Sequence, residues 1–370
     1  MEKKLHERVY ESLLGKISDK TYVPGAKIPT EYELMEEYGV SRNTVIHAIK
    51  RLESDRIVER KRRSGTFVCK NMASHEKARV IPMVLPYDSN MNADVYEGAQ
   101  EYALAHGCVI TFYNSFHSNK TEREILKKLL DTEPEGLIIY PCSMYSNIDV
   151  LSEYNIRGIP LLFLDRKLPG IGGSLVTANN EAGERELVNK LIAMGHRRIA
   201  FYLIHDNMLE TEQQRFFGYC NALIRNSIPL NYNYIIRCNV DIRHRHVLAT
   251  QQNQVNIVMD IIRQSVEKLL SLEERPTVVC CINDESAFMM IRALNERGLR
   301  VPEDISVTGF DNLMTAETHD PPLTTVQQNF FEMGKSAVQT ILYMLKNKAI
   351  LNTVTDTKLI LRASTAEISL

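Results

Sequence analysis

Six polar side chains in the C-terminal part of the chain have the chemistry that binds a polyhydroxylated molecule. Asp165 and Arg166 end the run PLLFLDR, Asn283 follows the run TVVCCI, and Asp311 follows ISVTGF. A hydroxyl group both donates and accepts hydrogen bonds, so carboxylate, guanidinium and amide groups at strand ends suit such a ligand. The candidate ligand-binding residues are Asp165, Arg166, Arg215, Asn283, Asp311 and Gln327.

Some of these candidates also have a purely structural interpretation. Asp165 and Arg166 can form an internal ion pair that fixes a loop, and either role fits the sequence. Asn283 and Asp284 stand where a helix is expected to begin, and one of the two is expected to cap it.

Arg215 and Asp311 are the pair that we expect to contact the ligand most directly. Arg215, in RFFGY, is expected to open a helix that faces a crevice between two lobes. An aromatic ring is also expected to stack on one face of the ligand. The residues considered for this role, without an order among them, are Tyr87, Tyr96, Tyr140 and Phe310.

The segment VSRNTVIHAIKRL, residues 40–52, predicts a helix with two different faces. Four apolar residues fall at i, i+3, i+4 and i+7 and form one stripe: Val45, Ala48, Ile49 and Leu52. On the other face, Arg42 can bind phosphate or guanine, Asn43 can bind adenine, and Ile46 can contact a thymine methyl group. Such a helix is suited to lie in the major groove of DNA.

A basic hairpin is expected directly after this helix. The segments IVER and TFVC predict two strands, and the turn KRRSG between them can place Arg62 and Arg63 in a minor groove. Lys50 and Arg51 can reach the DNA backbone. With the helical patterns at 4–18 and 31–38, this is the layout of a winged helix-turn-helix over residues 1–70.

Charge is distributed unevenly along the chain. The formal net charge is −2, yet residues 1–70 carry 15 Lys and Arg against 11 Asp and Glu. A basic patch on a small segment is typical of nucleic-acid binding. A small helical domain with an ordinary charged surface is the alternative that charge alone would allow.

The run KIPTEYELMEEYGVSRNTVIHAIKRLESDRIVERKRRSGTFV resembles the DNA-binding domain of GntR-family transcription regulators. The resemblance implies phosphate and base contacts at Arg42, Asn43, Thr44, Ile46 and Gly65. The chain departs from the family at position 46, which is often Arg, and at positions 55–56, where Asp-Arg replaces the usual Gly. The candidate DNA-binding residues are Lys4, Arg42, Asn43, Thr44, Ile46, Lys50, Arg51, Arg62, Arg63 and Gly65.

After a polar linker at 71–78, residues 79–370 alternate between apolar runs typical of strands and helical patterns. Strict alternation predicts parallel sheets covered by helices on both faces. Nearly 300 residues are too many for one such sheet, so two lobes are expected. The stretch 238–254 fits the alternation least and is expected to be an irregular insertion.

The C-terminal part contains four signatures in chain order: LDR, GHRRIAF with RFFGY, INDESA, and VPEDISVTGFDN followed by PPLTTVQQ. Together they resemble the effector domain of LacI/GalR-type repressors, which implies a two-lobed, type I periplasmic-binding-protein-like fold of parallel α/β sheets. A GntR-type domain before a LacI-type domain is similar to the arabinose repressor (AraR) subgroup. The resemblance implies that the six candidate residues bind sugar hydroxyls.

The sequence gives little support for a disulfide framework, a metal site or a catalytic site. The seven Cys residues lack a CxxC motif and indicate reduced thiols. His244 and His246 favour a polar loop over a metal site, because no Cys or carboxylate partners accompany them. No nucleophile elbow or phosphate-binding loop occurs, so we expect no cofactor and no metal. No long apolar segment or signal peptide is seen, which predicts a cytoplasmic protein without a membrane span.

We therefore expect a non-enzymatic transcription regulator of carbohydrate utilisation genes. Its partners would be a palindromic double-stranded operator, a second copy of the chain, and a small sugar such as L-arabinose. An activator that responds to a deoxysugar such as L-fucose fits the same residues. A sugar-modifying enzyme with an N-terminal interaction module is a further alternative, although the candidate residues include no evident acid–base pair.

Overall fold

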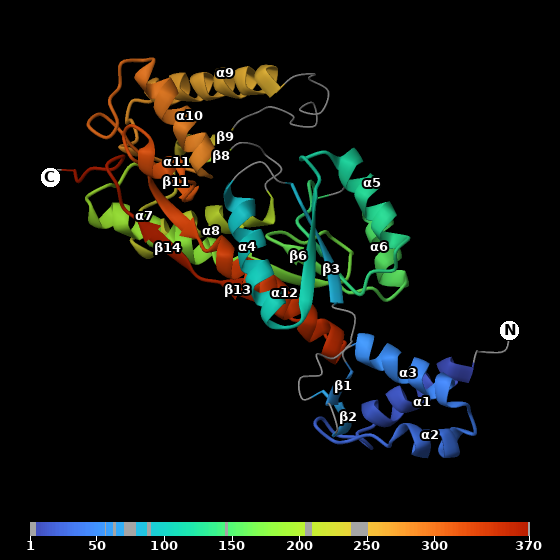
Figure 1. Cartoon of the computed structure of the whole chain (residues 1–370). Helices are drawn as coiled ribbons and strands as arrows, with labels where there is room; N and C mark the ends of the chain where they lie inside the picture. The colour runs from blue at the N-terminus through green and yellow to red at the C-terminus, as the bar shows by residue number, and fades with distance from the viewer. Residues whose placement is uncertain are drawn as a thin grey trace. The chain divides into compact units, whose positions relative to one another are not determined.

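The computed structural model describes residues 5–55, 57–61, 64–69, 79–86, 90–144, 147–203, 209–237 and 251–368, without the side chains of 90–91 and 251–257. The chain divides into two compact units, Met1–Ala78 and Arg79–Leu370 (Figure 1). The expected linker at 71–78 lies outside the described residues. So does most of the expected insertion, and its last residues, from Gln251, belong to a helix.

The N-terminal unit contains helices followed by a two-stranded antiparallel sheet. Its elements are α1 (Leu5–Ser18), α2 (Glu31–Tyr38), α3 (Arg42–Ser54), β1 (Val58–Lys61) and β2 (Gly65–Val68). Thr30 caps α2 in a capping box, and Gly39 ends it with a φ of +62°. Ser41 caps α3 by accepting a hydrogen bond from the backbone of Thr44.

The apolar stripe of α3 packs into the core of this unit. Its predicted members, Val45, Ala48, Ile49 and Leu52, are all buried, together with Val9, Leu13 and Ile17 of α1 and Leu34 of α2. The opposite face of α3 is left for solvent, as the two-faced pattern predicts.

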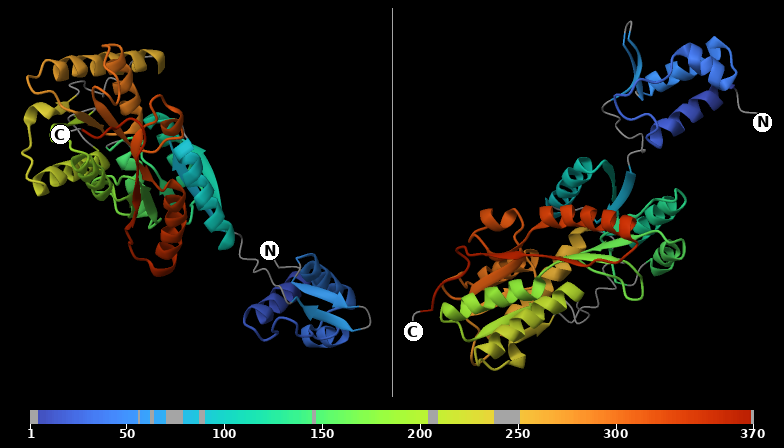
Figure 2. Two further views of the ribbon diagram at one scale, coloured as in Figure 1. Left: turned by 90° about the vertical axis from the view of Figure 1, so that its left-hand side faces the viewer. Right: turned by 90° about the horizontal axis from the view of Figure 1, so that it is seen from below.

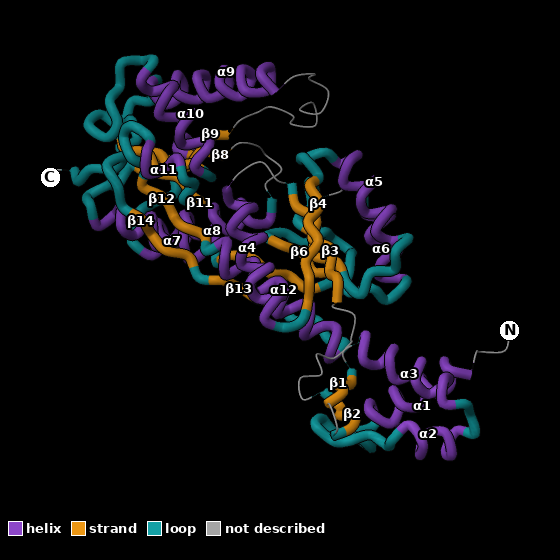
Figure 3. The backbone as a smooth tube through the Cα atoms, viewed as in Figure 1, coloured by secondary structure: helices purple, strands orange, loops and turns teal. Residues whose placement is uncertain are grey.

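The first lobe of the C-terminal unit is a parallel sheet in the order β13-β7-β6-β5-β3-β4. Its strands are β3 (Arg79–Leu85), β4 (Cys108–Asn114), β5 (Leu137–Ile139), β6 (Leu161–Leu164), β7 (Ser174–Ala178) and β13 (Thr353–Thr355). Its helices are α4 (Asn90–Ala105), α5 (Asn119–Leu130), α6 (Ile148–Ile156) and α12 (Phe330–Asn347). Helices α4 and α12 cover one face of the sheet, and α5 and α6 cover the other (Figure 3).

The second lobe is a sheet in the order β14-β12-β11-β10-β8-β9, in which only β14 is antiparallel to its neighbour among the described strands. Its strands are β8 (Ile199–Leu203), β9 (Ile235–Arg237), β10 (Val278–Cys281), β11 (Ser306–Asp311), β12 (Thr324–Gln328) and β14 (Thr357–Ile360). Its helices are α7 (Asn180–Ala193), α8 (Glu210–Arg225), α9 (Gln251–Leu270), α10 (Asp284–Asn295), the short α11 (Thr315–Thr318) and a 3-10 turn at Tyr232–Tyr234. Helices α7 and α8 cover one face, and α9 and α10 the other.

Glycines allow two helices of the first lobe to approach closely. Helices α4 and α12 lie side by side (Figure 2). A Cβ atom on Gly334 would lie 1.9 Å from the backbone oxygen of Val95, and one on Gly98 would lie 2.0 Å from that of Phe331. Any larger residue at either position would push the two helices apart.

In the described part of the chain, the backbone passes between the two lobes three times. The passages follow β7, β12 and β13. Asn179 donates its backbone N–H to the carbonyl oxygen of Thr355, which ties two of the passages together. Short connections of this kind allow two lobes to close on a ligand. None of the described helices is long and apolar enough to cross a membrane.

Candidate functional site

Arg215 lies at the centre of a polar cluster at the carboxyl ends of the second lobe's strands. Its Nε donates to Oδ1 of Asn180 at 2.9 Å, Nη1 to the backbone oxygen of Ile282 at 2.6 Å, and Nη2 to Oδ1 of Asp311 at 3.2 Å. The guanidinium lies 3.9 Å from the centroid of the Phe310 ring, and the residue is 6% exposed. Since each nitrogen is bonded, the position of the guanidinium is fixed before any ligand arrives.

Asp311 ends β11 with a φ of +115°, in a region that ordinarily favours glycine. Such backbone strain is concentrated at functional sites. Its Oδ1 also accepts a 2.6 Å hydrogen bond from Nε2 of Gln328. Burial raises the pKa of Asp311 to about 6, although Arg215 and Gln328 act in the opposite direction. The carboxylate is therefore ionised at neutral pH.

Asn283 and Asp284 have different structural roles at the start of α10. Asn283 caps the helix by accepting a 2.9 Å hydrogen bond from the backbone of Ser286, so one of the two residues does cap, as predicted. Asp284 is buried, and its carboxyl accepts bonds from Thr325 Oγ1 at 2.5 Å and the Leu313 backbone at 2.7 Å. Burial, and then Asp311, raise the pKa of Asp284 to about 8. Asp284 thereby holds the loop after β11.

The first lobe contributes a second polar cluster at the end of β6. Asp165 has a φ of +65° and lies 3.4 Å from Nη2 of Arg166, so the predicted internal ion pair is present. The same Nη2 donates to the hydroxyl of Tyr140 at 2.7 Å, and the guanidinium stacks 4.7 Å from the Tyr140 ring centroid. Both charged side chains are almost completely buried.

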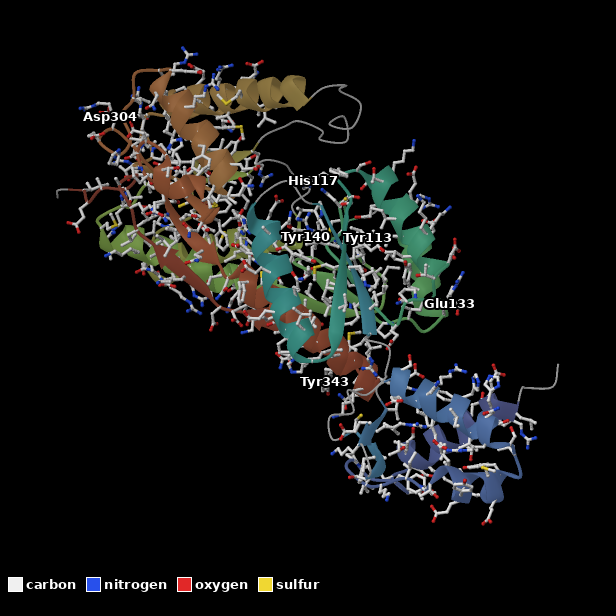
Figure 4. The ribbon with its side chains drawn as sticks, viewed as in Figure 1. Tyr113, His117, Glu133, Tyr140, Asp304 and Tyr343 are labelled. Atoms are coloured by element: carbon white, nitrogen blue, oxygen red, sulfur yellow. The ribbon has the colours of Figure 1, made fainter. Side chains whose placement is uncertain are left out.

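The two clusters face each other between the lobes. Figure 4 shows Tyr140 in the middle of the C-terminal unit. After burial, which is the largest cause, Asp311 also raises the pKa of Tyr140, and Asp165 contributes to the raised pKa of Asp311. The carboxyl groups at the ends of β6 and β11 therefore lie near enough to repel each other, and we treat the two clusters as one candidate site.

Gln327 was expected at this site, and the side chain bonded to Asp311 is that of its neighbour Gln328. Gln327 lies opposite Asp311 in the β11–β12 ladder, but Gln328 supplies the hydrogen bond to Asp311. Asn180 and Tyr140 were not selected as polar contacts from the sequence. The only signal for Asn180 was its place at the start of a helix, directly after a strand, where crevice residues gather.

In the N-terminal unit, Glu31 on α2 links α3 to the hairpin. One carboxylate oxygen lies 3.0 Å from Nε of Arg42 on α3, and the other lies 2.9 Å from Nη2 of Arg60 on β1. The guanidinium of Arg42 also lies 5.7 Å from the ring centroid of the exposed Tyr32. These contacts hold the first residue of α3 at the surface, with its side chain 57% exposed.

The other candidate DNA-binding residues of the N-terminal unit differ in their exposure to solvent. Asn43, Lys50 and Arg51 are exposed, and Thr44 and Ile46 are half-buried. The Arg51 guanidinium lies 4.3 Å from the Tyr10 ring centroid. Gly65 has a φ of +117°, which explains the glycine at the start of β2. Lys4, Arg62 and Arg63 lie outside the described residues.

The metal-like His244 and His246 also lie outside the described residues. Within the described ranges, no group of three or more His, Cys, Asp or Glu side chains is placed to hold a metal ion.

Two protein-family models match separate parts of the chain. Residues 5–68 match the bacterial regulatory proteins of the gntR family, and residues 188–365 match the periplasmic binding protein-like domain. The chain joins a gntR-type DNA-binding domain to a periplasmic-binding-protein-like domain. The fold class predicted from the sequence is thereby confirmed.

Relatives of nearly the same length match along almost the whole chain. The chain is 27% identical to the arabinose metabolism transcriptional repressor of Geobacillus stearothermophilus, over 97% of this chain and 96% of that protein. It is 26% identical to the repressor of the same name from Halalkalibacterium halodurans, with the same coverage. The predicted resemblance to the arabinose repressor subgroup is confirmed, and the chain is a transcription regulator.

Solved structures show the same fold in the C-terminal unit. A LacI family transcriptional regulator from Enterococcus faecium, crystallised with bound ribose, matches with a TM-score of 0.62 at 23% identity, over 79% of this chain and 100% of that chain. A regulatory protein of the LacI family from Chloroflexus aggregans matches with a TM-score of 0.64 at 22% identity, over 78% and 99% of the two chains.

Proposed function

We propose that the chain is a homodimeric, cytoplasmic repressor of carbohydrate utilisation genes, released from a palindromic operator when a small sugar binds. The observation that carries the proposal is the Arg215–Asp311 pair, which is buried and fixed inside the second unit of a chain whose first unit matches the gntR family. Hydroxyl groups suit a site whose donors and acceptors lie side by side.

The residues proposed to bind the sugar come from both lobes. Arg215, Asp311 and Asn283 would contact it from the second lobe, and Asp165 and Arg166 from the first. Gln328 replaces Gln327 in this proposal, because its amide already contacts Asp311. Stacking against the sugar is assigned to Tyr140, which lies in the cluster at the end of β6.

The charge balance of the cluster favours a neutral sugar over a phosphorylated one. Arg215 is paired with Asp311, and Arg166 with Asp165. A phosphate group would have to compete with a buried carboxylate for each guanidinium. L-Arabinose is the first candidate because relatives of nearly full length are arabinose metabolism repressors.

Sugar binding would act on DNA binding through closure of the two lobes. A ligand shifts this equilibrium only by its differential affinity for the open and closed states. Closure would change how two chains are held together and so misalign two α3 helices with operator half-sites. At the operator, Arg42, Asn43 and Ile46 would contact bases, while Thr44, Lys50, Arg51 and Gly65 would contact the DNA backbone.

Thermal melting of the purified chain against pentoses, hexoses, deoxysugars and their phosphates tests this proposal. A ligand at 100 times its dissociation constant adds about 2.7 kcal/mol of stability, so an effector should raise the melting temperature visibly. The chain contains no Trp, so a dye or calorimetry is required. Stabilisation by a sugar phosphate alone would contradict the neutral-sugar assignment.

Two further measurements separate the alternatives. The stabilising sugar should be recovered unchanged after prolonged incubation, whereas its conversion would indicate the sugar-modifying enzyme. Binding to operator DNA should weaken when the sugar is added. Sugar-dependent strengthening with increased transcription would indicate the activator, for which L-fucose is the deoxysugar to include.

A further inference from the structure

Glu184 is a buried acidic residue behind the proposed sugar site. It lies on α7 one helical turn after Asn180, which accepts a hydrogen bond from Arg215. The residue is 1% exposed, and neither carboxyl oxygen has a hydrogen-bond partner among the described residues. A buried ionised carboxylate without partners is strongly disfavoured, so this arrangement requires an explanation.

Close packing of α7 against α8 prevents Glu184 from reaching solvent. A Cβ atom on Gly218 would lie 2.9 Å from Cβ of Glu184 and 2.4 Å from the backbone oxygen of Glu181. The helices can approach only because position 218 is a glycine. Leu187 and Val188 continue the buried face of α7 beyond Glu184.

The surroundings of Glu184 determine which form of the carboxyl is stable. Burial raises the pKa of Glu184 to about 8, and the nearby positive charge of Arg215 only partly opposes this. The other titratable groups that face it are Tyr219 on α8 and Cys280 and Cys281 on β10, whose pKa values burial raises. These three groups stay neutral near pH 7 and offer no compensating charge.

Arg215 has N–H groups that could donate hydrogen bonds to a second carboxylate. A guanidinium carries five N–H groups, and among the described residues its Nη1 and Nη2 each make one hydrogen bond. An ionised Glu184 would attract this guanidinium and compete with Asp311 for it. A protonated Glu184 fills the same space without that competition.

We propose that Glu184 is a positioning residue for sugar binding, which by remaining a neutral carboxylic acid leaves the Arg215 guanidinium to Asp311 and the sugar. Ionisation of Glu184 weakens sugar binding through Arg215, without any contact between Glu184 and the sugar. The inference rests on the proposed function, since it assumes that the Arg215–Asp311 pair binds the sugar.

The protonation state is tested first without any ligand. The parent chain, Glu184→Gln and the control Glu186→Gln, whose site is exposed on the same helix, are melted from pH 5 to pH 9. A carboxyl whose pKa is raised on folding loses its stabilising contribution as pH rises from about 4.5 to about 8. The melting temperature of E184Q should therefore exceed that of the parent by an amount that grows up to pH 8 and then stays constant. The difference between E186Q and the parent should not vary with pH.

The positioning role is then tested by titration calorimetry with L-arabinose and, in parallel, D-ribose. The parent is expected to bind its sugar about fivefold more weakly at pH 9 than at pH 7, the change that follows if binding raises the pKa of Glu184 by one unit from about 8. E184Q is expected to bind with the same constant at both pH values, because its side chain cannot ionise. Asp284, whose pKa is also about 8, is unchanged in both proteins, so it cannot cause a difference between them.

Two results would overturn the inference. A melting difference that is independent of pH would mean that Glu184 is ionised in the folded protein. An equal loss of affinity at pH 9 in E184Q and the parent would mean that another group controls binding. If neither sugar nor any other in the panel binds, the proposed function fails and the positioning role fails with it. The melting comparison then still reports whether Glu184 is protonated. Failure of the proposed function can thus be distinguished from failure of the inference about Glu184.

Discussion

Arg42 in the N-terminal unit and Arg215 in the C-terminal unit have opposite surroundings. On α3, Arg42 is 57% exposed and touches Glu31 at the surface. In the C-terminal unit, Arg215 is 6% exposed and bonded to Asn180, Ile282 and Asp311. An exposed charge carries little desolvation penalty and can attract the many phosphates of DNA. Salt screens this attraction. A small neutral ligand instead requires donors that are already fixed.

Removal of Arg215 is expected to give the largest effect. Arg215→Ala leaves the buried carboxylate of Asp311 without its cation, which destabilises the C-terminal unit by about 3–5 kcal/mol. Sugar binding should be lost as well. Thermal and chemical unfolding would measure the first effect, and calorimetry the second. Arg225→Ala, at the exposed end of the same helix, is the matched control. Equal stability of the two variants would show that the pair does not support the fold.

On the exposed face of α3, a comparable truncation should leave the fold unaffected. Asn43→Ala removes an exposed side chain that is proposed to contact a base, so operator binding should weaken by about 1–3 kcal/mol. Discrimination between operator variants should decrease at the position that Asn43 contacts. Mobility shifts with base-substituted operators would measure both quantities. A clear fall in melting temperature would instead indicate that Asn43 supports the helix.

The pH dependence of sugar binding should reveal the ionisation of Asp311. Its pKa is raised to about 6, so the carboxylate that pairs with Arg215 forms only as pH rises through this value. Sugar affinity is therefore expected to fall about tenfold between pH 7 and pH 5, in proportion to the ionised fraction. Calorimetry at the two pH values would measure the change. The Asp311→Asn variant should bind the sugar weakly at both pH values. Equal sugar affinity of the parent at pH 5 and pH 7 would show that Asp311 takes no part in sugar binding.

The smallest effect is expected from a single exposed lysine. Lys50→Ala should weaken binding to all DNA sequences alike and reduce the slope of log affinity against log salt concentration by about 0.9. Titrations of specific and unrelated DNA at several salt concentrations would determine the slope. The substitution should leave sugar affinity unchanged, and a selective loss at the specific operator would indicate a base contact instead.

Patterns with a fixed period allowed much of the fold to be predicted. The stripe at Val45, Ala48, Ile49 and Leu52 predicted a two-faced helix, because the 3.6-residue repeat places these side chains on one side. Strict alternation of strands and helices predicted parallel sheets with both faces covered, as the two lobes show. Polar residues at strand ends then identified Asp165 and Asp311, since the carboxyl ends of parallel strands share one edge.

The sequence by itself thus determined the two kinds of domain and the edge of the sheets where a ligand is expected to bind. Only the tertiary structure decided which polar side chains meet there. Gln327 and Gln328 are adjacent in sequence, and the register pairs Asp311 with Gln327, yet at the end of β11, where Asp311 has a φ of +115°, its carboxylate is bonded by Gln328. Asn180 bonds Arg215, and Glu184 lies within the influence of its charge, because Gly218 lets α7 and α8 approach closely. The physical reason is that strand and helix periods are local, whereas hydrogen bonds between α7, α8 and β11 depend on how separate elements pack.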